Sequence, residues 1–453
     1  MKRIWLVLPD PLPTRVFFDC GIVDRLRARL PDKLALVFVG EDPAPWLPRA
    51  EGLPVLGQAT LLPQRVGPVE RVRRRADRFL DDHAGFYPLA LRVNVRHGFH
   101  RERMRRGHDN WFLDPGRAGR LPKWERLERA MFRWHFSRRR HVPSALLRRM
   151  REDCDGLVVA NLQTRSAVPF LTAARRLGIP IVGYVSSWDH TVGKGAISPF
   201  AARYVVQNET MRRDLAAYHG ITGERVEVTG WPQTDVFHER RPRARYEDLV
   251  RGFGLDPSRP LVLVMGNTPT NAPYEDRFVA RLLGWWRESG AHERFQLLFR
   301  PHPRDRRWRE RFALPAGTTG AAVQEPAYTD LDALATLLQH GDAVVANAGT
   351  ILLDALVNDR PAVCVLYDEG APPDDRWAEL NVSGEHYREL LESEAFYRAR
   401  SFEEVVAGIE RALADPAELA AERARAARSV VGEVDGHAAD RVADVIVRTL
   451  APG

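Results

Sequence analysis

The sequence predicts an α/β protein made of two Rossmann-like, doubly wound domains that face a cleft. Three observations lead to this prediction. The chain has 453 residues, more than a single hydrophobic core usually serves. Short apolar segments alternate with helix-like segments in both halves, as in parallel sheets covered by helices. A polar stretch rich in Arg and Pro separates the halves, so we predict domains at 1–237 and 260–453 joined by a linker at 238–259.

The N-terminal half opens with the rhythm of a βαβ unit. The apolar run at 4–8 is too short for a secretory signal and far shorter than the roughly 20 apolar residues of a membrane-spanning helix, so we interpret it as a buried strand. A helix-like stretch follows at 23–30. Further strands are predicted at 34–40, 156–161, 179–185, 204–208 and 224–230, with helices at 164–178 and 209–220 between them.

The C-terminal half repeats the alternation. Strands are predicted at 260–266, 295–303, 342–347 and 361–368, and helices near 275–289, at 330–340 and at 350–357. From about residue 401 the chain is rich in Ala, Arg and Glu, which predicts two or three closing helices. This pattern specifies a second doubly wound domain.

The cysteines give no sign of a metal site or a disulfide framework. Cys20, Cys154 and Cys364 are far apart and form no CxxC pair, which fits a reducing cytoplasm. No acidic pair is well placed to hold a metal, because Asp81-Asp82 and Asp374-Asp375 are expected to face solvent. We therefore expect a cytoplasmic protein that needs neither a metal nor a cofactor.

One segment, 65–151, carries the positive charge of the chain. It holds 23 Arg and one Lys against nine acidic residues, a net charge of +15, so the remaining residues sum to −8 within the overall +7. Aromatic residues are interleaved with the arginines, and we predict an inserted, mostly helical or loop-rich subdomain. Three interpretations stay open: docking on anionic lipid at the inner face of the plasma membrane, stacking on single-stranded nucleic acid, and a solvated face. Nucleic acid is the least favoured.

Polar residues follow the predicted strands of the C-terminal half, where ligands of open α/β sheets bind. Asn267 and Thr268 come after the first strand and offer short hydrogen-bonding side chains. Arg300 and His302 come after the second, held between prolines in RPHP. A guanidinium and an imidazole at a strand end suit the oxygens of a pyrophosphate.

A third loop leads from a strand into the helix at 350–357. Gly349 would let a phosphate approach the N–H groups of that helix, Thr350 begins it, and Asp354 lies one turn further on, where a carboxylate can accept bonds from ribose hydroxyls. Taken singly, each loop has a plain structural explanation; together they predict a nucleotide-diphosphate pocket. The chain has no GxxxxGK[ST] loop and no GxGxxG after its first strand, which removes the usual support for kinase, ATPase and dehydrogenase functions.

A loop at 186–195 in the N-terminal half is the candidate acceptor site. Trp188 and Lys194 could hold a sugar-like acceptor, and Asp189 or His190 could act as the general base that removes a proton from its hydroxyl. A simple polar connection between elements is the alternative.

Three passages resemble a known family. The run VVQNETMRRDLAAYHGITGERVEVTGWPQTDVF at 205–237, the RPHP loop, and GDAVVANAGTILLDALVNDRPAVCV resemble GT-B enzymes, in particular CDP-glycerol glycerophosphotransferases and capsule or cell-surface polysaccharide glycosyltransferases. The resemblance covers roughly residues 155–370. It implies a metal-independent transfer in which the C-terminal residues bind the donor and Gly230 and Pro232 shape the cleft. Gly349-Thr350 replaces the paired Ser usual in the glycerophosphotransferases, and His190 replaces Asn in an SWDN-x-T-x-KG element.

The sequence therefore predicts a transferase that moves a group from a nucleotide-diphosphate donor to a cell-surface glycan or lipid-linked acceptor. A non-hydrolysing nucleotide-sugar 2-epimerase is the alternative among enzymes, although such an enzyme has no evident use for the basic segment. A peripheral membrane or nucleic-acid-binding protein that relies on that segment is the alternative of another class.

Overall fold

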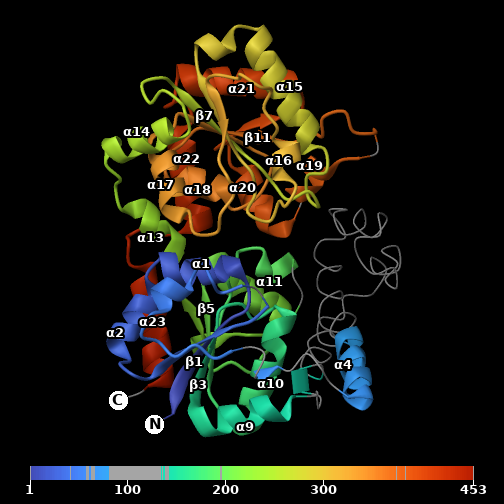
Figure 1. The fold of residues 1–453 in the computed structure, drawn as a ribbon, viewed down its shortest axis with the longest axis vertical. Coiled ribbons are helices and arrows are strands. Elements are labelled where there is room, and N and C mark those ends of the chain that lie inside the picture. Colours follow the sequence, from blue (N-terminus) through green and yellow to red (C-terminus); the bar gives the residue numbers. More distant parts are fainter. Residues whose placement is uncertain are drawn as a thin grey trace. The chain divides into compact units, whose positions relative to one another are not determined.

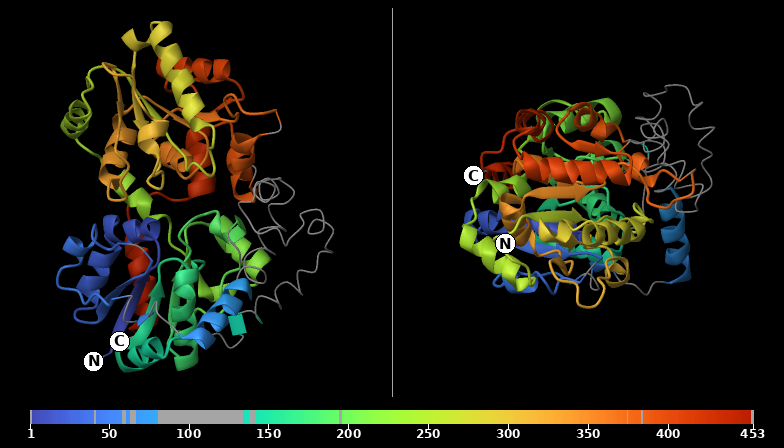
Figure 2. Two further views of the ribbon diagram at one scale, coloured as in Figure 1. Left: turned by 45° about the vertical axis from the view of Figure 1, so that its right-hand side comes forward. Right: turned by 90° about the horizontal axis from the view of Figure 1, so that it is seen from above.

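The computed structural model describes residues 2–40, 42–57, 61–62, 67–80, 134, 136–137, 142–193, 196–373, 375–382 and 384–451. The chain folds into two compact units, one made of residues 1–235 and 435–453 and the other of residues 236–434. Each unit contains one six-stranded sheet in which neighbouring strands pair in parallel. Helices cover the sheets (Figures 1 and 2). The predicted fold class, two doubly wound α/β domains, is confirmed.

The first sheet has the order β2-β1-β3-β4-β5-β6. Its first four strands along the chain are almost wholly buried, because apolar residues face helices on both sides. The strands of the sheet are β1 (Arg3–Leu8), β2 (Leu34–Phe38), β3 (Cys154–Val159), β4 (Ile181–Tyr184), β5 (Arg203–Val206) and β6 (Val226–Val228). The helices include α1 (Pro11–Asp19), α2 (Ile22–Arg29), α9 (Ser144–Asp153), α10 (Val168–Leu177), α11 (His190–Gly193), α12 (Glu209–Asp214) and α13 (Pro232–His238). As predicted, α10 ends at Gly178, whose φ of +69° suits glycine.

The second sheet has the order β12-β11-β10-β7-β8-β9. Its strands are β7 (Leu261–Met265), β8 (Gln296–Arg300), β9 (Ala321–Val323), β10 (Ala343–Ala346), β11 (Ala362–Val365) and β12 (Tyr397–Ala399). The helices are α14 (Arg243–Gly252), α15 (Glu275–Glu288), α16 (Trp308–Arg311), α17 (Leu331–His340), α18 (Ile351–Val357), α19 (Trp377–Asn381), α20 (Arg388–Glu392), α21 (Phe402–Ala414) and α22 (Ala420–Ala426). Side chains of β7, β8, α15 and α21 form its apolar core.

The division into units differs from the predicted domains at two places. The stretch predicted as a linker, 238–259, contains α14, whose Tyr246 is buried beside His340 of α17 in the second unit. The last helix, α23 (Ala438–Leu450), belongs to the first unit although we assigned it to the C-terminal domain. Its buried residues Val442, Val445 and Ile446 cover the first sheet. The helix lies close to β3, because a Cβ added at Gly156 would lie only 3.1 Å from Leu450.

The subdomain predicted at 65–151 lies largely outside the described residues. Its described parts include α4 (Pro68–Leu80), residues 134 and 136–137, and α9. In the part of the chain that the structure describes, no helix is both long and apolar enough to cross a membrane.

Candidate functional site

The second sheet reverses its direction of growth between β7 and β10. From β7 the chain adds β8 and β9 on one side and then returns to place β10 on the other. The loops after β7 and β10 therefore leave in opposite directions, and a crevice at this edge is the usual ligand site of an open α/β sheet. All three predicted donor loops leave from this edge.

The loops after β7 and β8 lie in close contact. The N–H of Gly266 donates to the carbonyl of Arg300 at 2.9 Å. A Cβ at position 266 would lie 2.7 Å from the Phe312 ring and 3.1 Å from the Cα of Pro301, so only glycine fits without a shift. In the RPHP loop, Nδ1 of His302 accepts from the N–H of Arg304 at 3.0 Å. The proton of the neutral ring therefore lies on Nε2, which makes Nε2 a donor.

The loop after β10 is tied to the loop after β7 by an amide. Nδ2 of Asn381 donates to Oδ1 of Asn347 at 2.7 Å and to the carbonyl of Asn271 at 2.8 Å. Asn347 itself donates to the carbonyl of Val365 at 2.7 Å. Neither residue stands out in the sequence, since Asn347 follows a strand, where asparagine is common in turns, and Asn381 ends the helix α19. The three donor loops thus meet at one edge.

Arg300 is held by neighbours inside the second unit. Its Nε donates to Gln324 at 3.0 Å and its Nη2 to the carboxylate of Asp330. The side chains of Arg300 and Asp330 are only 9% and 12% exposed. The phosphate contact predicted for this guanidinium stays a prediction. Its contacts with Gln324 and Asp330 join the ends of β8 and β9 to the start of α17.

The other residues predicted to bind the donor differ in their contacts and in their burial. The carbonyl oxygen of the Asn267 side chain accepts from the N–H of Thr268 at 2.7 Å, which shapes the turn. Gly349 has a φ of +121°, and its N–H donates to the hydroxyl of Tyr387 at 2.5 Å. Thr350 is partly exposed and makes no capping bond to α18. Asp354 is buried, at 3% exposure.

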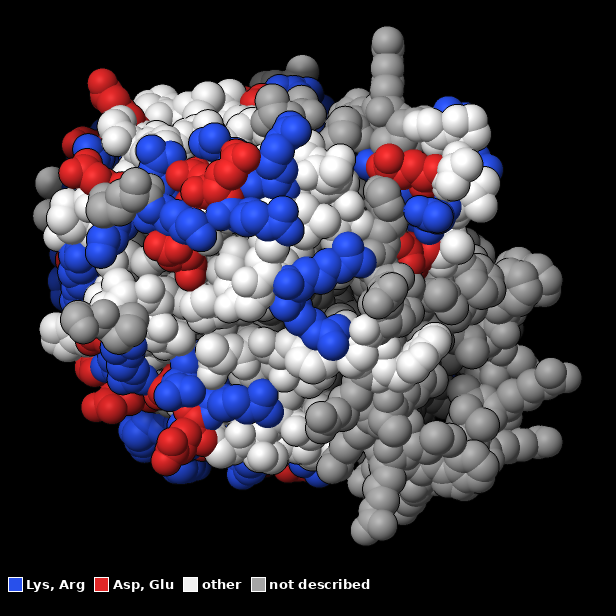
Figure 3. Space-filling model, turned by 90° about the horizontal axis from the view of Figure 1, so that it is seen from below, with Lys and Arg blue, Asp and Glu red and all other residues white. Residues whose placement is uncertain are grey.

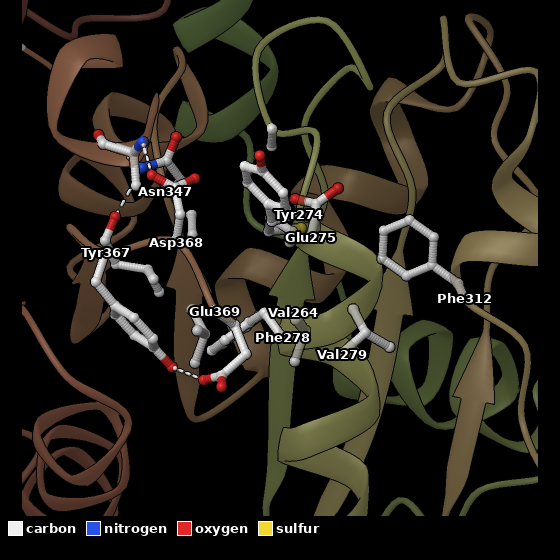
Figure 4. A pocket seen from close by; sticks show the side chains of 16 residues that line it. Val264, Tyr274, Glu275, Phe278, Val279, Phe312, Asn347, Tyr367, Asp368 and Glu369 are labelled. Carbon is white, nitrogen blue, oxygen red and sulfur yellow. Dashed lines mark hydrogen bonds between the residues drawn. The ribbon is translucent and has the colours of Figure 1, made fainter. Parts of the chain in front are cut away.

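A small pocket adjoins this edge, between α15 and the ends of β7, β10 and β11. Figure 4 shows its polar lining, with Tyr274 and Glu275 near one another and Tyr367 donating to Glu369 at 3.1 Å. The remaining lining is mainly apolar and includes Phe278. This pocket was not predicted, because its lining comes from six separate stretches of sequence.

Two buried carboxylates share one guanidinium beside the pocket. Arg311 donates to Glu275 at 2.9 Å and lies 3.2 Å from Asp305. Glu275 also accepts the N–H of Asn267 at 2.8 Å, so the cluster fixes the β7 loop. Burial raises the pKa of Glu275 to about 8, against the opposing effects of Arg311 and of that N–H. Asp305 adds a smaller rise because its charge has the same sign.

The predicted acceptor loop of the first unit brings three polar side chains together. Oγ of Ser186 lies 3.3 Å from Nδ1 of His190, and Nε2 of His190 lies 4.0 Å from Oδ1 of Asp189. Gln163, from the loop after β3, donates to the carbonyl of His190 at 2.8 Å. Trp188 is only 5% exposed, and its contact with an acceptor stays a prediction. Lys194 lies outside the described residues.

Buried polar groups anchor this acceptor loop. Thr191 donates to Asp214 at 2.7 Å. The buried His219 accepts the N–H of Ile197 on Nδ1 at 3.0 Å and bonds the carbonyl of Thr191 through Nε2 at 2.8 Å. These bonds hold both ends of the stretch 191–197. They therefore help to position His190, which directly precedes it.

The VTGWPQTD stretch forms a turn, begins α13 and caps α23 in the first unit. Gly230 has a φ of +81°, and Pro232 begins α13. The carboxylate of Asp235 accepts the N–H groups of Ala438 and Ala439 at 3.0 and 2.7 Å and thereby caps α23. Burial raises the pKa of Asp235, and these two N–H groups oppose the rise. The predicted role of Gly230 and Pro232 in shaping a cleft stays a prediction.

The described residues show no cluster that could bind a metal ion. No group of three or more His, Cys, Asp or Glu side chains there is arranged to hold an ion. That a metal and a cofactor are unnecessary stays a prediction.

Solved structures share this architecture over nearly the whole chain. The UDP-GlcNAc 2-epimerase of Neisseria meningitidis bound to UDP-GlcNAc superposes with a TM-score of 0.55 at 10% identity, over 100% of both chains. The UDP-GlcNAc 2-epimerase of Methanocaldococcus jannaschii gives 0.55 at 11% identity, over 99% of both chains. S. aureus MnaA in complex with UDP gives 0.54 at 13% identity, over 99% of this chain and 96% of that one. The chain has the GT-B fold.

At these identities the likeness establishes the GT-B fold and leaves the activity to be argued from the residues. No protein-family model matches the sequence, and no curated protein matches it.

Proposed function

We propose that the protein is a glycosyltransferase, or a related glycerophosphotransferase-like enzyme, which moves a group from a nucleotide-diphosphate donor to a cell-surface glycan or lipid-linked acceptor. One observation carries the proposal: three polar loops meet at the carboxyl edge of the second sheet, at the switch point between β7 and β10. The GT-B fold supports it, because the similar solved structures include complexes with UDP and UDP-GlcNAc.

The second unit supplies the donor side. His302 offers Nε2–H to a diphosphate oxygen, and Thr350 offers its hydroxyl from the loop after β10. As the bond between the nucleotide and the transferred group breaks, negative charge grows on the phosphate oxygens of the departing nucleotide, and these hydrogen-bond donors stabilise it. Arg300 supports this edge through its bonds to Gln324 and Asp330. Contacts of Asn267, Thr268, Gly349 and Asp354 with the donor remain part of the proposal.

The first unit supplies the base. In a glycosyl transfer, the acceptor hydroxyl loses its proton to His190 while its oxygen forms the new bond to the sugar carbon, the bond from that carbon to the diphosphate breaks, and nucleoside diphosphate leaves. In a glycerophosphoryl transfer, the same oxygen bonds the phosphorus of the transferred group, the bond between the two phosphates breaks, and nucleoside monophosphate leaves. Asp189, with its carboxylate 4.0 Å from Nε2 of His190, would stabilise the imidazolium that results. Ser186 and Gln163 hold the imidazole and its backbone in place.

A nucleotide-sugar 2-epimerase is the second candidate. It is favoured by the similar solved structures, several of which are UDP-GlcNAc 2-epimerases. The two functions differ in their need for an acceptor. An epimerase converts its sugar nucleotide without one, whereas a transferase releases its nucleotide, the diphosphate after glycosyl transfer or the monophosphate after glycerophosphoryl transfer, only when an acceptor takes the group.

Calorimetry and NMR spectroscopy test both candidates. Wild-type protein is titrated with UDP, CDP and GDP, and His302→Ala is expected to weaken the binding of one of them by about tenfold or more. His292→Ala is the matched control, because His292 is exposed and precedes β8, whereas His302 follows it. Absence of binding by all three diphosphates would contradict the donor site. Inversion at C2 of UDP-GlcNAc without an acceptor would instead establish the epimerase.

A further inference from the structure

The most exposed large apolar side chains in the described residues lie near the two ends of the basic segment 65–151. Val69 is 67% exposed, Val72 66% and Trp134 55%, against 43% for Leu47 and 40% for Val55. A single exposed valine needs no explanation. Three such side chains at the borders of one Arg-rich segment form a pattern that a simple solvated face does not account for.

Three apolar residues of helix α4 face outward. Val69, Val72 and Ala76 follow helical spacing, and all three are exposed. Glu70, Arg74 and Asp77 occupy another face at the same kind of spacing and are half-buried, with Glu70 and Arg74 forming an ion pair. An ordinary surface helix buries its apolar stripe and exposes its charges, so this arrangement is the reverse of the usual one.

Cations border the exposed apolar face. Arg71, Arg73 and Arg75 are exposed on α4. Within the described part of the chain, Arg73 and Arg75 have no ion-pair partner. Elsewhere arginines often adjoin acids: Figure 3 shows blue and red side chains together over much of one described face, and Arg25 pairs with Asp440 at 2.7 Å.

The segment also reaches the acceptor loop. Phe136, two residues after the exposed Trp134, packs against Val192 and Ala196, close to His190 in the sequence. The carbonyl of Phe136 accepts from Arg175 of α10 at 2.8 Å. One end of the basic segment is therefore fastened beside the candidate base.

We propose that α4 and Trp134 form a docking surface for an anionic lipid bilayer, so that the acceptor reaches His190 from the membrane. Val69 and Val72 enter the boundary between headgroups and acyl chains, the Trp134 ring lies at the interface, and Arg73 and Arg75 contact lipid phosphates. The inference rests on the proposed transferase function in naming a lipid-linked acceptor as the substrate class. The docking itself does not require that function.

Vesicle sedimentation tests the docking surface with the full-length protein and no donor. Vesicles of phosphatidylcholine, with and without phosphatidylglycerol, are compared at low and high salt. We expect binding only to the anionic vesicles, weakened by salt. Val69→Asp/Val72→Asp and Arg73→Glu/Arg75→Glu should each lower the partition coefficient by at least about tenfold. Val55→Asp and Arg251→Glu/Arg307→Glu are matched controls on exposed residues and should bind as the wild type does.

Four outcomes would overturn the inference. They are no binding of wild type to anionic vesicles at low salt, unchanged binding by the α4 variants, binding to a labelled oligonucleotide in place of vesicles, and a melting temperature that falls in Val69→Asp/Val72→Asp but not in Val55→Asp. The last would show that the valines are covered by the chain itself. Donor titration of the same variants is independent, so a failed donor site and a failed docking surface give different results.

Discussion

Removing the guanidinium of Arg300 should destabilise the second unit strongly. The Arg300 and Asp330 side chains are 9% and 12% exposed, and Nε of Arg300 also bonds Gln324. Arg300→Ala leaves a buried carboxylate without its cation. Breaking one side of a buried pair costs about 3–5 kcal/mol. We therefore expect the free energy of unfolding of the second unit to fall by that amount.

Urea unfolding followed by hydrogen exchange of peptides from β8 and β9 measures this loss within one unit. Asp330→Ala completes a double-mutant cycle, and we expect the pair to show about 1–3 kcal/mol of coupling. The exposed pair Arg309–Glu325, with both side chains 70% exposed, is the control. Arg309→Ala should cost less than about 1 kcal/mol.

The opposite result would refute the structural interpretation of Arg300. If Arg300→Ala costs less than about 1 kcal/mol and shows no coupling to Asp330, yet abolishes diphosphate binding, then the guanidinium faces the ligand as the sequence first indicated. A large loss of stability with coupling would mean instead that donor binding by this variant reports folding rather than contact.

Three further predictions concern other parts of the chain. Because the pKa of Glu275 is raised from 4.5 to about 8, the folded protein keeps a proton that the unfolded chain releases, so stability should fall as pH rises between those values. Over this pH range the melting temperature of Glu275→Gln should fall less than that of the wild type. Melting temperatures that change in parallel with pH would contradict the raised pKa of Glu275. Asp235→Ala removes both bonds to α23 and should cost about 1–3 kcal/mol, with faster hydrogen exchange in that helix; unchanged exchange would disprove the cap. Gly266→Ala should cost about 1–3 kcal/mol and weaken donor binding. Gly284→Ala, inside α15 with open space around it, should stabilise by about 0.5–1 kcal/mol and leave the titrations unchanged, and equal effects of the two substitutions would contradict the close approach at Gly266.

The location of the candidate site could be predicted, because parallel strands bring their carboxyl ends to one edge. The loops carrying Asn267, His302 and Gly349 do meet there. The partners of individual side chains could not be predicted. Arg300 pairs with a residue 30 positions away, and Trp188 is buried. Burial and pairing depend on which distant segments fold against a residue.

Apolar periodicity and the glycine or proline at helix ends were enough to predict two α/β domains, most of their strands and the loops at the strand ends. They could not predict that α23 returns to the first unit, where Asp235 caps it, because that contact joins residues about 200 positions apart. Only the structure placed Arg311 between Glu275 and Asp305, and the valines of α4 on the outside. An apolar or charged face is visible in a sequence, but the surface that covers it is made by residues far away in the chain, and their complementarity exists only in the folded state.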